Sequence, residues 1–205
     1  MPKCTFVHHT RPSHEIVRLL FERKLDAGVA THPASDTSGL VDYPLLRDPF
    51  VLALPADSPF DPEALMRGQG DLPFLRYSRN QVIGTLIEAH LRRSRISLAN
   101  RFELESNQSL LGMVAEGSGW AITTPACYGR ARRFHDRIDL HPFPGKEFTR
   151  TLSLFTTDVY PANMAVLIAQ ALRRLITQHF TDPVTQRYPW LAPGFRVLEG
   201  GDPVA

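Results

Sequence analysis

The sequence has few of the features that assign a protein quickly to a functional class. No apolar run approaches the roughly 18 residues that span a membrane, and the first twelve residues hold no apolar signal-peptide core. The chain has only two cysteines, Cys4 and Cys127, and they are not spaced as a metal-binding pair. These absences favour a cytoplasmic protein that does not associate with membranes, in which both cysteines are buried thiols.

The sequence also has little net charge. Its 23 lysines and arginines and 21 aspartates and glutamates leave a formal charge of +2, which excludes the broad basic field of a nucleic-acid-binding surface. Hydrophobic residues make up 43% and charged residues 21%, as in ordinary globular proteins. A length of 205 residues suits one large domain or two small lobes.

The N-terminal part alternates between strand and helix patterns. Residues 4–8 and 25–30 are predicted strands, and Ser13 is a candidate N-cap for a helix between them, with Ile16 and Leu20 on its apolar face. A strand–helix–strand unit with short connections predicts a parallel sheet covered by helices, and hence an α/β fold.

The middle of the chain continues this pattern. Residues 50–54 and 73–77 are predicted strands, and Asp61 is placed to cap a short helix between them. Thr85 and Glu88 have the spacing of a capping box, in which the two side chains satisfy free amides at a helix start.

A second strand–helix–strand unit follows at residues 102–123. Apolar and acidic residues alternate over residues 102–105, as in a half-buried strand. Ser106 or Asn107 can cap the next helix, and Gly117 suits the left-handed position at its end. A strand at residues 120–123 then stops at Pro125.

The C-terminal part begins with a strand at residues 149–157 and a long helix at 161–180, which has one apolar stripe. The tail from Thr181 is rich in proline and glycine, and it either lies against the body or is loose.

Motifs for cofactors, metals and catalysis are weak. Gly117 and Gly119 resemble a dinucleotide loop, but they precede a strand and Ile122 stands where the third glycine is needed. His8, His9 and His14 lack an acid or further histidine to complete a metal shell. No nucleophile elbow or acid/base pair is visible, so we predict no metal, no cofactor and no enzymatic activity.

Four stretches resemble the effector-binding domain of LysR-type transcriptional regulators. They are LDAGV at 25–29, YPLLRDPFVLALP at 43–55 with DSP at 57–59, RYSR at 76–79, and MVAEGSGWAITTP at 113–125. The resemblance covers most of residues 5–180. It departs at Lys24, where the family usually has glycine.

The resemblance implies the type 2 periplasmic-binding-protein fold, with two Rossmann-like lobes joined by two hinge crossings. Lobe I would comprise residues 1–48 and 149–205, and lobe II residues 49–148. Family members begin with a winged helix–turn–helix and then the first strand and helix of lobe I, whereas this chain starts near the second strand of that lobe. We therefore expect DNA binding only through a domain outside this chain, and a lobe I without its first strand and helix.

The resemblance also implies where an effector binds. Family effectors lie between the lobes and contact the loop before the first helix of lobe I, the loop after the first strand of lobe II, and the second hinge strand. Arg79 is the candidate partner of an effector carboxylate, because its planar fork can bind one bidentately; the alternative is a solvated arginine on the rim. Ser13 and Ser78 could instead be plain helix or turn caps. The candidate ligand-binding residues are Thr10, Ser13, Tyr77, Ser78, Arg79, Asn80, Thr123, Thr124 and Thr149.

By this resemblance the chain is the sensory domain of a transcription regulator, a homodimer or homotetramer that binds a small organic effector, with an anion as the first candidate. Two alternatives remain open. A stand-alone solute-binding protein of the same fold would normally be exported, and an enzyme on an α/β scaffold would need an acid/base pair in the cleft.

Overall fold

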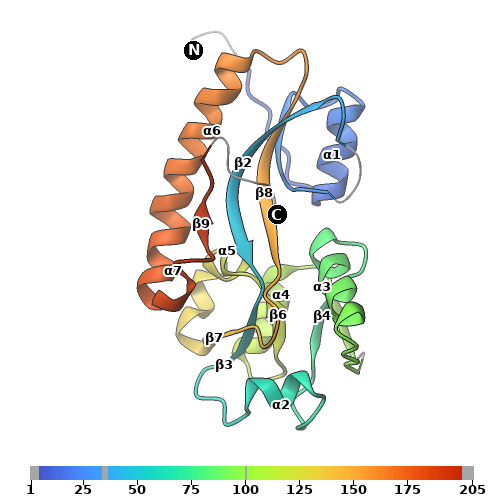
Figure 1. Ribbon diagram of the computed structural model, residues 1–205, viewed down its shortest axis with the longest axis vertical. Helices are drawn as coiled ribbons and strands as arrows, with labels where there is room; N and C mark the ends of the chain where they lie inside the picture. Colours follow the sequence, from blue (N-terminus) through green and yellow to red (C-terminus); the bar gives the residue numbers. More distant parts are fainter. Residues whose placement is uncertain (1–4, 34–36, 100, 200–205) are drawn as a thin grey trace.

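The computed structural model describes residues 5–33, 37–99 and 101–199, which form two α/β lobes linked by long strands (Figure 1). Lobe I is built on a four-stranded sheet in the order β1–β8–β2–β9, and every neighbouring pair is antiparallel. Helices α1 and α6 lie on opposite sides of its long strands (Figure 1). The elements of lobe I are α1 (Ser13–Phe21), β1 (Ala27–Thr31), β2 (Leu40–Pro49), β8 (Thr149–Thr157), α6 (Ala162–Ile176) and β9 (Arg196–Val197).

Lobe II has a mixed sheet. An antiparallel group, β6–β3–β7, is joined through an isolated parallel bridge between Phe74 and Trp120 to a parallel pair, β4–β5. The elements of lobe II are β3 (Val51–Pro55), α2 (Pro62–Met66), β4 (Leu75–Tyr77), α3 (Val82–Arg93), β5 (Phe102–Leu104), α4 (Asn107–Ala115), β6 (Ala121–Thr123), α5 (Pro125–Gly129), a 3₁₀ helix η1 (Arg132–Arg137) and β7 (Ile138–Pro142).

The chain crosses between the lobes twice, from β2 into β3 and from β7 into β8. Phe50 lies in the first crossing and Phe148 in the second, and their rings stack with centroids 4.1 Å apart. The backbone N–H of Phe50 donates to the carbonyl of Phe148 at 3.0 Å. His90 of α3 stacks on the other face of Phe148 at 3.7 Å. This aromatic stack ties both crossings to a helix of lobe II.

Several local predictions are confirmed. The Asp61 carboxylate caps α2 by accepting from the amides of Glu63 and Ala64, and the Ser106 hydroxyl caps α4. Gly117 has a φ of +75° directly after α4, where a side chain would be strained. The unit over residues 102–123 forms strand, helix and strand as expected, and both of its strands run parallel to the segment around β4.

The predicted first strand is wrong over residues 5–8, and Cys4 lies outside the described residues. Phe6 and Val7 are exposed, and residues 5–8 belong to no strand of the described chain. Since β1 pairs instead with the antiparallel β8, the parallel pairing expected for this unit does not form. A local apolar pattern does not make a strand without a neighbour to complete its hydrogen bonds.

Two predicted helix caps are also wrong, because Ser13 and Glu88 have partners distant in sequence. Ser13 lies inside the first turn of α1, and its hydroxyl accepts from the backbone N–H of Thr31 at 3.1 Å. The helix expected to start at Thr85 starts earlier, at Val82. Glu88 forms an ion pair with the buried Arg76.

The predicted helix over residues 161–180 is confirmed, although its last turn is π-helical, and the tail packs against the body. After α6 come a π-helical turn, η2 (Thr177–Thr181), then α7 (Asp182–Arg187), a 3₁₀ helix η3 (Pro189–Leu191) and β9. The hydroxyls of Thr177 and Thr181 bond to carbonyls four residues earlier, which tends to bend a helix. Pro183 removes a helical donor at the same place.

Candidate functional site

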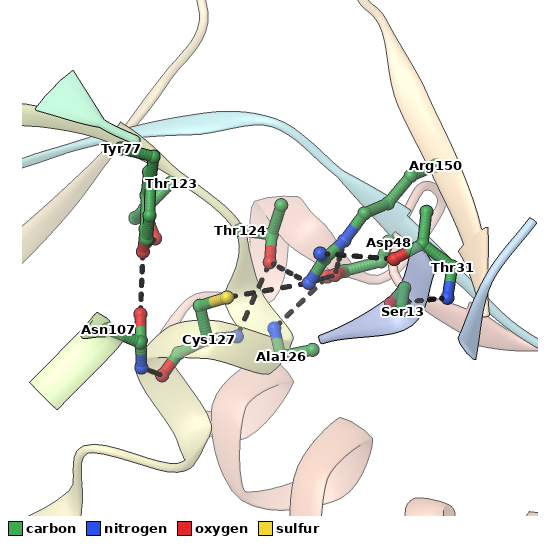
Figure 2. Close-up of polar contacts among 10 residues, drawn as sticks. All are labelled: Ser13, Thr31, Asp48, Tyr77, Asn107, Thr123, Thr124, Ala126, Cys127 and Arg150. Atoms are coloured by element: carbon green, nitrogen blue, oxygen red, sulfur yellow. Dashed lines mark hydrogen bonds and ion pairs between the residues drawn. The ribbon is translucent and has the colours of Figure 1, made fainter. Parts of the chain in front are cut away.

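A buried ion pair joins the two strands that lead into lobe II. Asp48 of β2 lies opposite Arg150 of β8 in the antiparallel register. Arg150 Nε donates to Asp48 Oδ2 at 2.9 Å, and the two side chains are only 9% and 0% exposed (Figure 2). A buried charge is tolerated when it is paired and hydrogen-bonded, so this pair holds the two strands together where they leave lobe I.

The same guanidinium reaches both lobes. Its Nη2 donates to Thr124 Oγ1 at 3.0 Å and contacts Cys127 Sγ at 3.4 Å, both in lobe II. Its Nη1 makes a long contact of 3.5 Å to the Thr31 hydroxyl at the end of β1 (Figure 2). A change in the arrangement of the two lobes would therefore alter the hydrogen bonds of Arg150.

Helix α5 is placed by its own N-terminus. The Thr124 hydroxyl accepts from the Cys127 amide at 3.3 Å, and Pro125 occupies the first helical position, where its missing N–H costs nothing. The amide of Ala126 donates to Asp48 Oδ1 at 3.0 Å. A carboxylate is favoured at a helix start, so this bond holds the start of α5 against β2, the strand that leads into the first crossing.

A second group of hydrogen bonds lies next to α5 in lobe II. The Tyr77 hydroxyl donates to Asn107 Oδ1 at 2.6 Å and lies 2.9 Å from Thr123 Oγ1. Asn107 Nδ2 in turn donates to the carbonyl of Cys127 at 3.0 Å (Figure 2). We call Thr31, Asp48, Tyr77, Asn107, Thr123, Thr124, Cys127 and Arg150 the polar cluster.

Burial controls the charge state of the polar cluster. It raises the pKa of the Tyr77 phenol well above its usual range, and Cys127 adds to the effect, so Tyr77 stays neutral at physiological pH. Burial alone would lower the pKa of Arg150, but Cys127 and Asp48 raise it above its usual range. The cluster therefore combines one internally balanced ion pair with hydroxyl and amide groups that can donate or accept.

The structure brings four of the predicted ligand-binding residues together. Tyr77, Thr123 and Thr124 belong to the polar cluster, and Ser13 adjoins it through its bond to the Thr31 amide (Figure 2). These residues come from both lobes, as the resemblance implied.

The other predicted residues lie outside these hydrogen bonds. Thr10 and Asn80 are exposed, and Thr149 pairs with Pro49 in the sheet. The Ser78 hydroxyl accepts from the Asn80 amide at 3.3 Å, as a turn cap does. The Arg79 side chain is exposed, while its backbone N–H donates to Glu103 and lowers the pKa of that carboxyl. Its role toward a carboxylate remains a prediction.

Sequence reasoning missed several members of the cluster, which are Thr31, Asp48, Asn107, Cys127 and Arg150. One usable signal was present for the ion pair: Asp48 and Arg150 are charged residues directly beside the two expected crossings. Asn107 was considered only as a helix cap. No local pattern places Thr31 or Cys127 in the cluster, because Arg150, which contacts both, is distant in sequence.

Most of the chain matches the model of a known protein family. Residues 1–181 match the family model for the LysR substrate binding domain. The chain belongs to this family, whose members are the effector-binding, sensory domains of LysR-type transcriptional regulators. No curated protein matches the chain.

Solved structures agree on the fold. The regulatory domain of HypT from Salmonella typhimurium is 18% identical, with a TM-score of 0.66 over 87% of this chain and 86% of that one. The OxyR2 regulatory domain from Vibrio vulnificus is 15% identical, with a TM-score of 0.65 over 80% and 79%. The effector binding domain of QuiR in complex with shikimate is 15% identical, with a TM-score of 0.63 over 83% and 80%. The type 2 periplasmic-binding-protein fold is thereby confirmed.

Two further searches of the described residues found nothing. Among residues 5–33, 37–99 and 101–199, no three or more histidines, cysteines, aspartates or glutamates are grouped so that they could hold a metal ion. Within the same ranges, no helix has the length and apolar character needed to cross a membrane.

Proposed function

We propose that this sensory domain binds its effector at the polar cluster, between lobe I (residues 1–48 and 149–205) and lobe II (residues 49–148). The carrying observation is that one guanidinium, that of Arg150 on β8, contacts Asp48 of β2, Thr31 of β1 and the N-cap residue of α5, Thr124. A ligand that exchanges hydrogen bonds with these groups interacts differently with different lobe arrangements. That difference is what allows a ligand to shift a conformational equilibrium.

The effector that fits is a small organic molecule with several polar groups. The hydroxyls of Tyr77 and Thr123 and the amide of Asn107 bond to one another, and a ligand's hydroxyl or carbonyl groups could replace these bonds at little net cost. The charge of Arg150 is already balanced by Asp48. Arg79 is the proposed carboxylate partner if the effector is an anion.

The response we propose is a population shift in a homodimer or homotetramer in the cytoplasm. The ligand favours one arrangement of the lobes, and the change is passed to DNA by a domain outside this chain. The domain does this by binding alone, without catalysis.

A thermal-shift screen tests the proposal. The chain is melted with small carboxylates, amino acids and aromatic acids, because a ligand that binds only the folded state raises the melting temperature. Each active compound is then titrated against Tyr77→Phe and Thr123→Val, which remove single hydroxyls of the cluster. Ser118→Ala is the control, since it removes an exposed hydroxyl after α4.

The proposal predicts a saturable shift that is weakened in both cluster variants and unchanged in Ser118→Ala. Loss of one hydrogen bond should weaken affinity by roughly three- to tenfold. If every active compound binds both cluster variants as tightly as the natural protein, the effector site is elsewhere. An additional loss for carboxylates alone in Arg79→Ala would assign Arg79 its role.

A further inference from the structure

The segment that follows the family match is as well packed as the core. The match to the family model ends at residue 181, and residues 182–199, which we call the C-terminal strap, continue through α7, η3 and β9. Val184, Leu191, Phe195 and Leu198 of the strap are each at most 2% exposed. A tail that merely ended the chain would not bury its large apolar side chains so completely.

The first half of the strap is bonded to lobe II. The Tyr188 hydroxyl donates to the carbonyl of Ile138 at 3.2 Å and accepts from the amide of Leu140 at 3.4 Å, both in β7. Arg187 donates to the carbonyl of His135 at 2.9 Å and pairs with Asp136 at 3.3 Å. Two neighbouring strap residues are therefore fixed to the strand that leads into the second crossing and to the helix before it.

The second half of the strap returns to lobe I. Val197 and Arg196 pair with β2 in an antiparallel register, and the amide of Leu198 donates to the carbonyl of Leu45 at 2.9 Å. Arg47 of β2 also donates to the carbonyl of Gly194 at 3.0 Å. Since α6 belongs to lobe I, the chain runs from lobe I over lobe II and back to lobe I (Figure 1).

Helix α5 lies between the strap and the polar cluster. A Cβ added at Gly129, near the end of α5, would lie 3.5 Å from a Val184 methyl group, and the ring of Tyr128 meets that of Tyr188 edge-on at 5.8 Å. The start of the same helix donates from Ala126 to Asp48. A displacement of the strap would therefore move α5 and weaken the hydrogen bond from the Ala126 amide to Asp48 in the other lobe.

We propose that the C-terminal strap is a third connection between the lobes, which restricts their movement about the two crossings. The two crossings leave lobe II from β3 and from β7, which are neighbouring strands of one sheet. Because the crossings lie side by side, they alone allow the lobes to rotate about them. The strap is bonded to both lobes along another path, and hinging must break its bonds to β7 or to β2. This inference goes beyond the proposed function, because it concerns the free protein whether or not an effector binds.

Hydrogen–deuterium exchange of the Ala126 amide tests this role, since its partner Asp48 lies on the hinge strand. The main variant is Tyr188→Phe, which keeps the ring and removes the hydroxyl bonds to β7. Arg187→Gln weakens the neighbouring anchor. Gln186→Ala is the matched control, because Gln186 is exposed on the same strap. The amide of Leu110 in α4 reports on global unfolding.

The strap role predicts that exchange at Ala126 becomes roughly three- to tenfold faster in Tyr188→Phe, less so in Arg187→Gln, and stays unchanged in Gln186→Ala. Leu110 should be unaffected in all three. Faster exchange confined to Leu140 in β7 would overturn the proposal, because the strap would then only cover that strand. No change at Ala126, or an equal increase at Ala126 and Leu110, would overturn it as well.

Discussion

The two faces of strand β8 are covered to very different extents. Leu154 faces the main hydrophobic cluster, which extends through lobe II and along α6. Its neighbour Phe155 faces a separate small cluster whose other buried members are Val17, Leu20 and Ala30. Because side chains alternate along a strand, one residue separates the thickest part of the core from its thinnest.

The face of β8 that carries Phe155, which we call the thin face, also has polar groups that are not hydrogen-bonded within the described residues. Thr151 and Ser153 lie on the same face as Phe155 by alternation, and within the described residues their buried hydroxyls have no hydrogen-bond partner. Helix α1 covers this face, and β1, which lies beside β8 in the sheet, is paired on one edge only in the part of the chain that the structure describes. The side of lobe I that carries Ser13 and Thr31 therefore has the weaker packing, and it is the side that we expect to adapt most easily.

The largest effect should come from removing the ion pair that lies between these regions. In Arg150→Ala, Asp48 stays buried with a single amide partner, so the free energy of unfolding should fall by about 3–5 kcal/mol in urea titrations. Arg67→Ala is the control, because Arg67 pairs with Asp61 and Glu63 on the surface and should cost no more than about 1 kcal/mol. A loss below about 1 kcal/mol in Arg150→Ala would mean that the hinge does not depend on this pair.

A matched pair of leucine truncations compares the two clusters directly. Leu111 of α4 and Leu20 of α1 are both 0% exposed. Leu111→Ala should cost about 4–5 kcal/mol and Leu20→Ala about 2–3 kcal/mol, because the thinner cluster can collapse around the lost volume. Equal losses in urea titrations would show that the small cluster is packed as rigidly as the main one.

Acid should weaken lobe II in particular. Burial lowers the pKa of His90, His135 and His141, all of which lie in lobe II or its crossings. The unfolded chain, with histidine pKa values near about 6.5, binds more protons than the folded chain below that pH. The stability these residues contribute is therefore complete above about pH 6.5 and falls as the pH drops through their lowered pKa values.

Urea titrations at pH 7.5 and 5.5 measure this loss. His90→Phe keeps a ring on Phe148 and cannot be protonated, so its loss between the two pH values should be smaller than that of the natural protein. An identical loss in both proteins would mean that His90 is not protonated more readily in the unfolded state.

The smallest effect should come from the unpartnered hydroxyls of the thin face. Ser153→Ala removes a buried group that makes no hydrogen bond among the described residues, so stability should change by less than about 1 kcal/mol, in the stabilising direction. Thr124→Val is the contrast, because this hydroxyl caps α5 and its loss should cost about 1–2 kcal/mol. Thermal melts of both variants compare them, and a clear loss in Ser153→Ala would reveal a partner for that hydroxyl.

The contrast between local and distant partners also explains what could be predicted from the sequence. Asp61, Ser106 and Gly117 act on the helix next to them, so spacing alone identified them. The two lobes followed from the family resemblance. Ser13 and Glu88 were assigned to local caps, but their partners, Thr31 and Arg76, lie 18 and 12 positions away in the sequence.

The site was harder to predict for the same reason. Tyr77, Thr123 and Thr124 were found because the resemblance placed their loops between the lobes. Asp48 and Arg150 are 102 positions apart, and only the antiparallel pairing of β2 with β8 brings them together. A single sequence carries no direct signal of such pairing.

The central claim is that the effector binds at the polar cluster. The most direct test is a crystal structure of the chain with a compound that raises its melting temperature. The claim predicts the compound within hydrogen-bond distance of Tyr77, Asn107 or Thr123. A compound that instead occupies the hollow of about 460 Å³ beside α6 and α7, lined by Arg174 and Gln178 among others, and does not contact the cluster would contradict it.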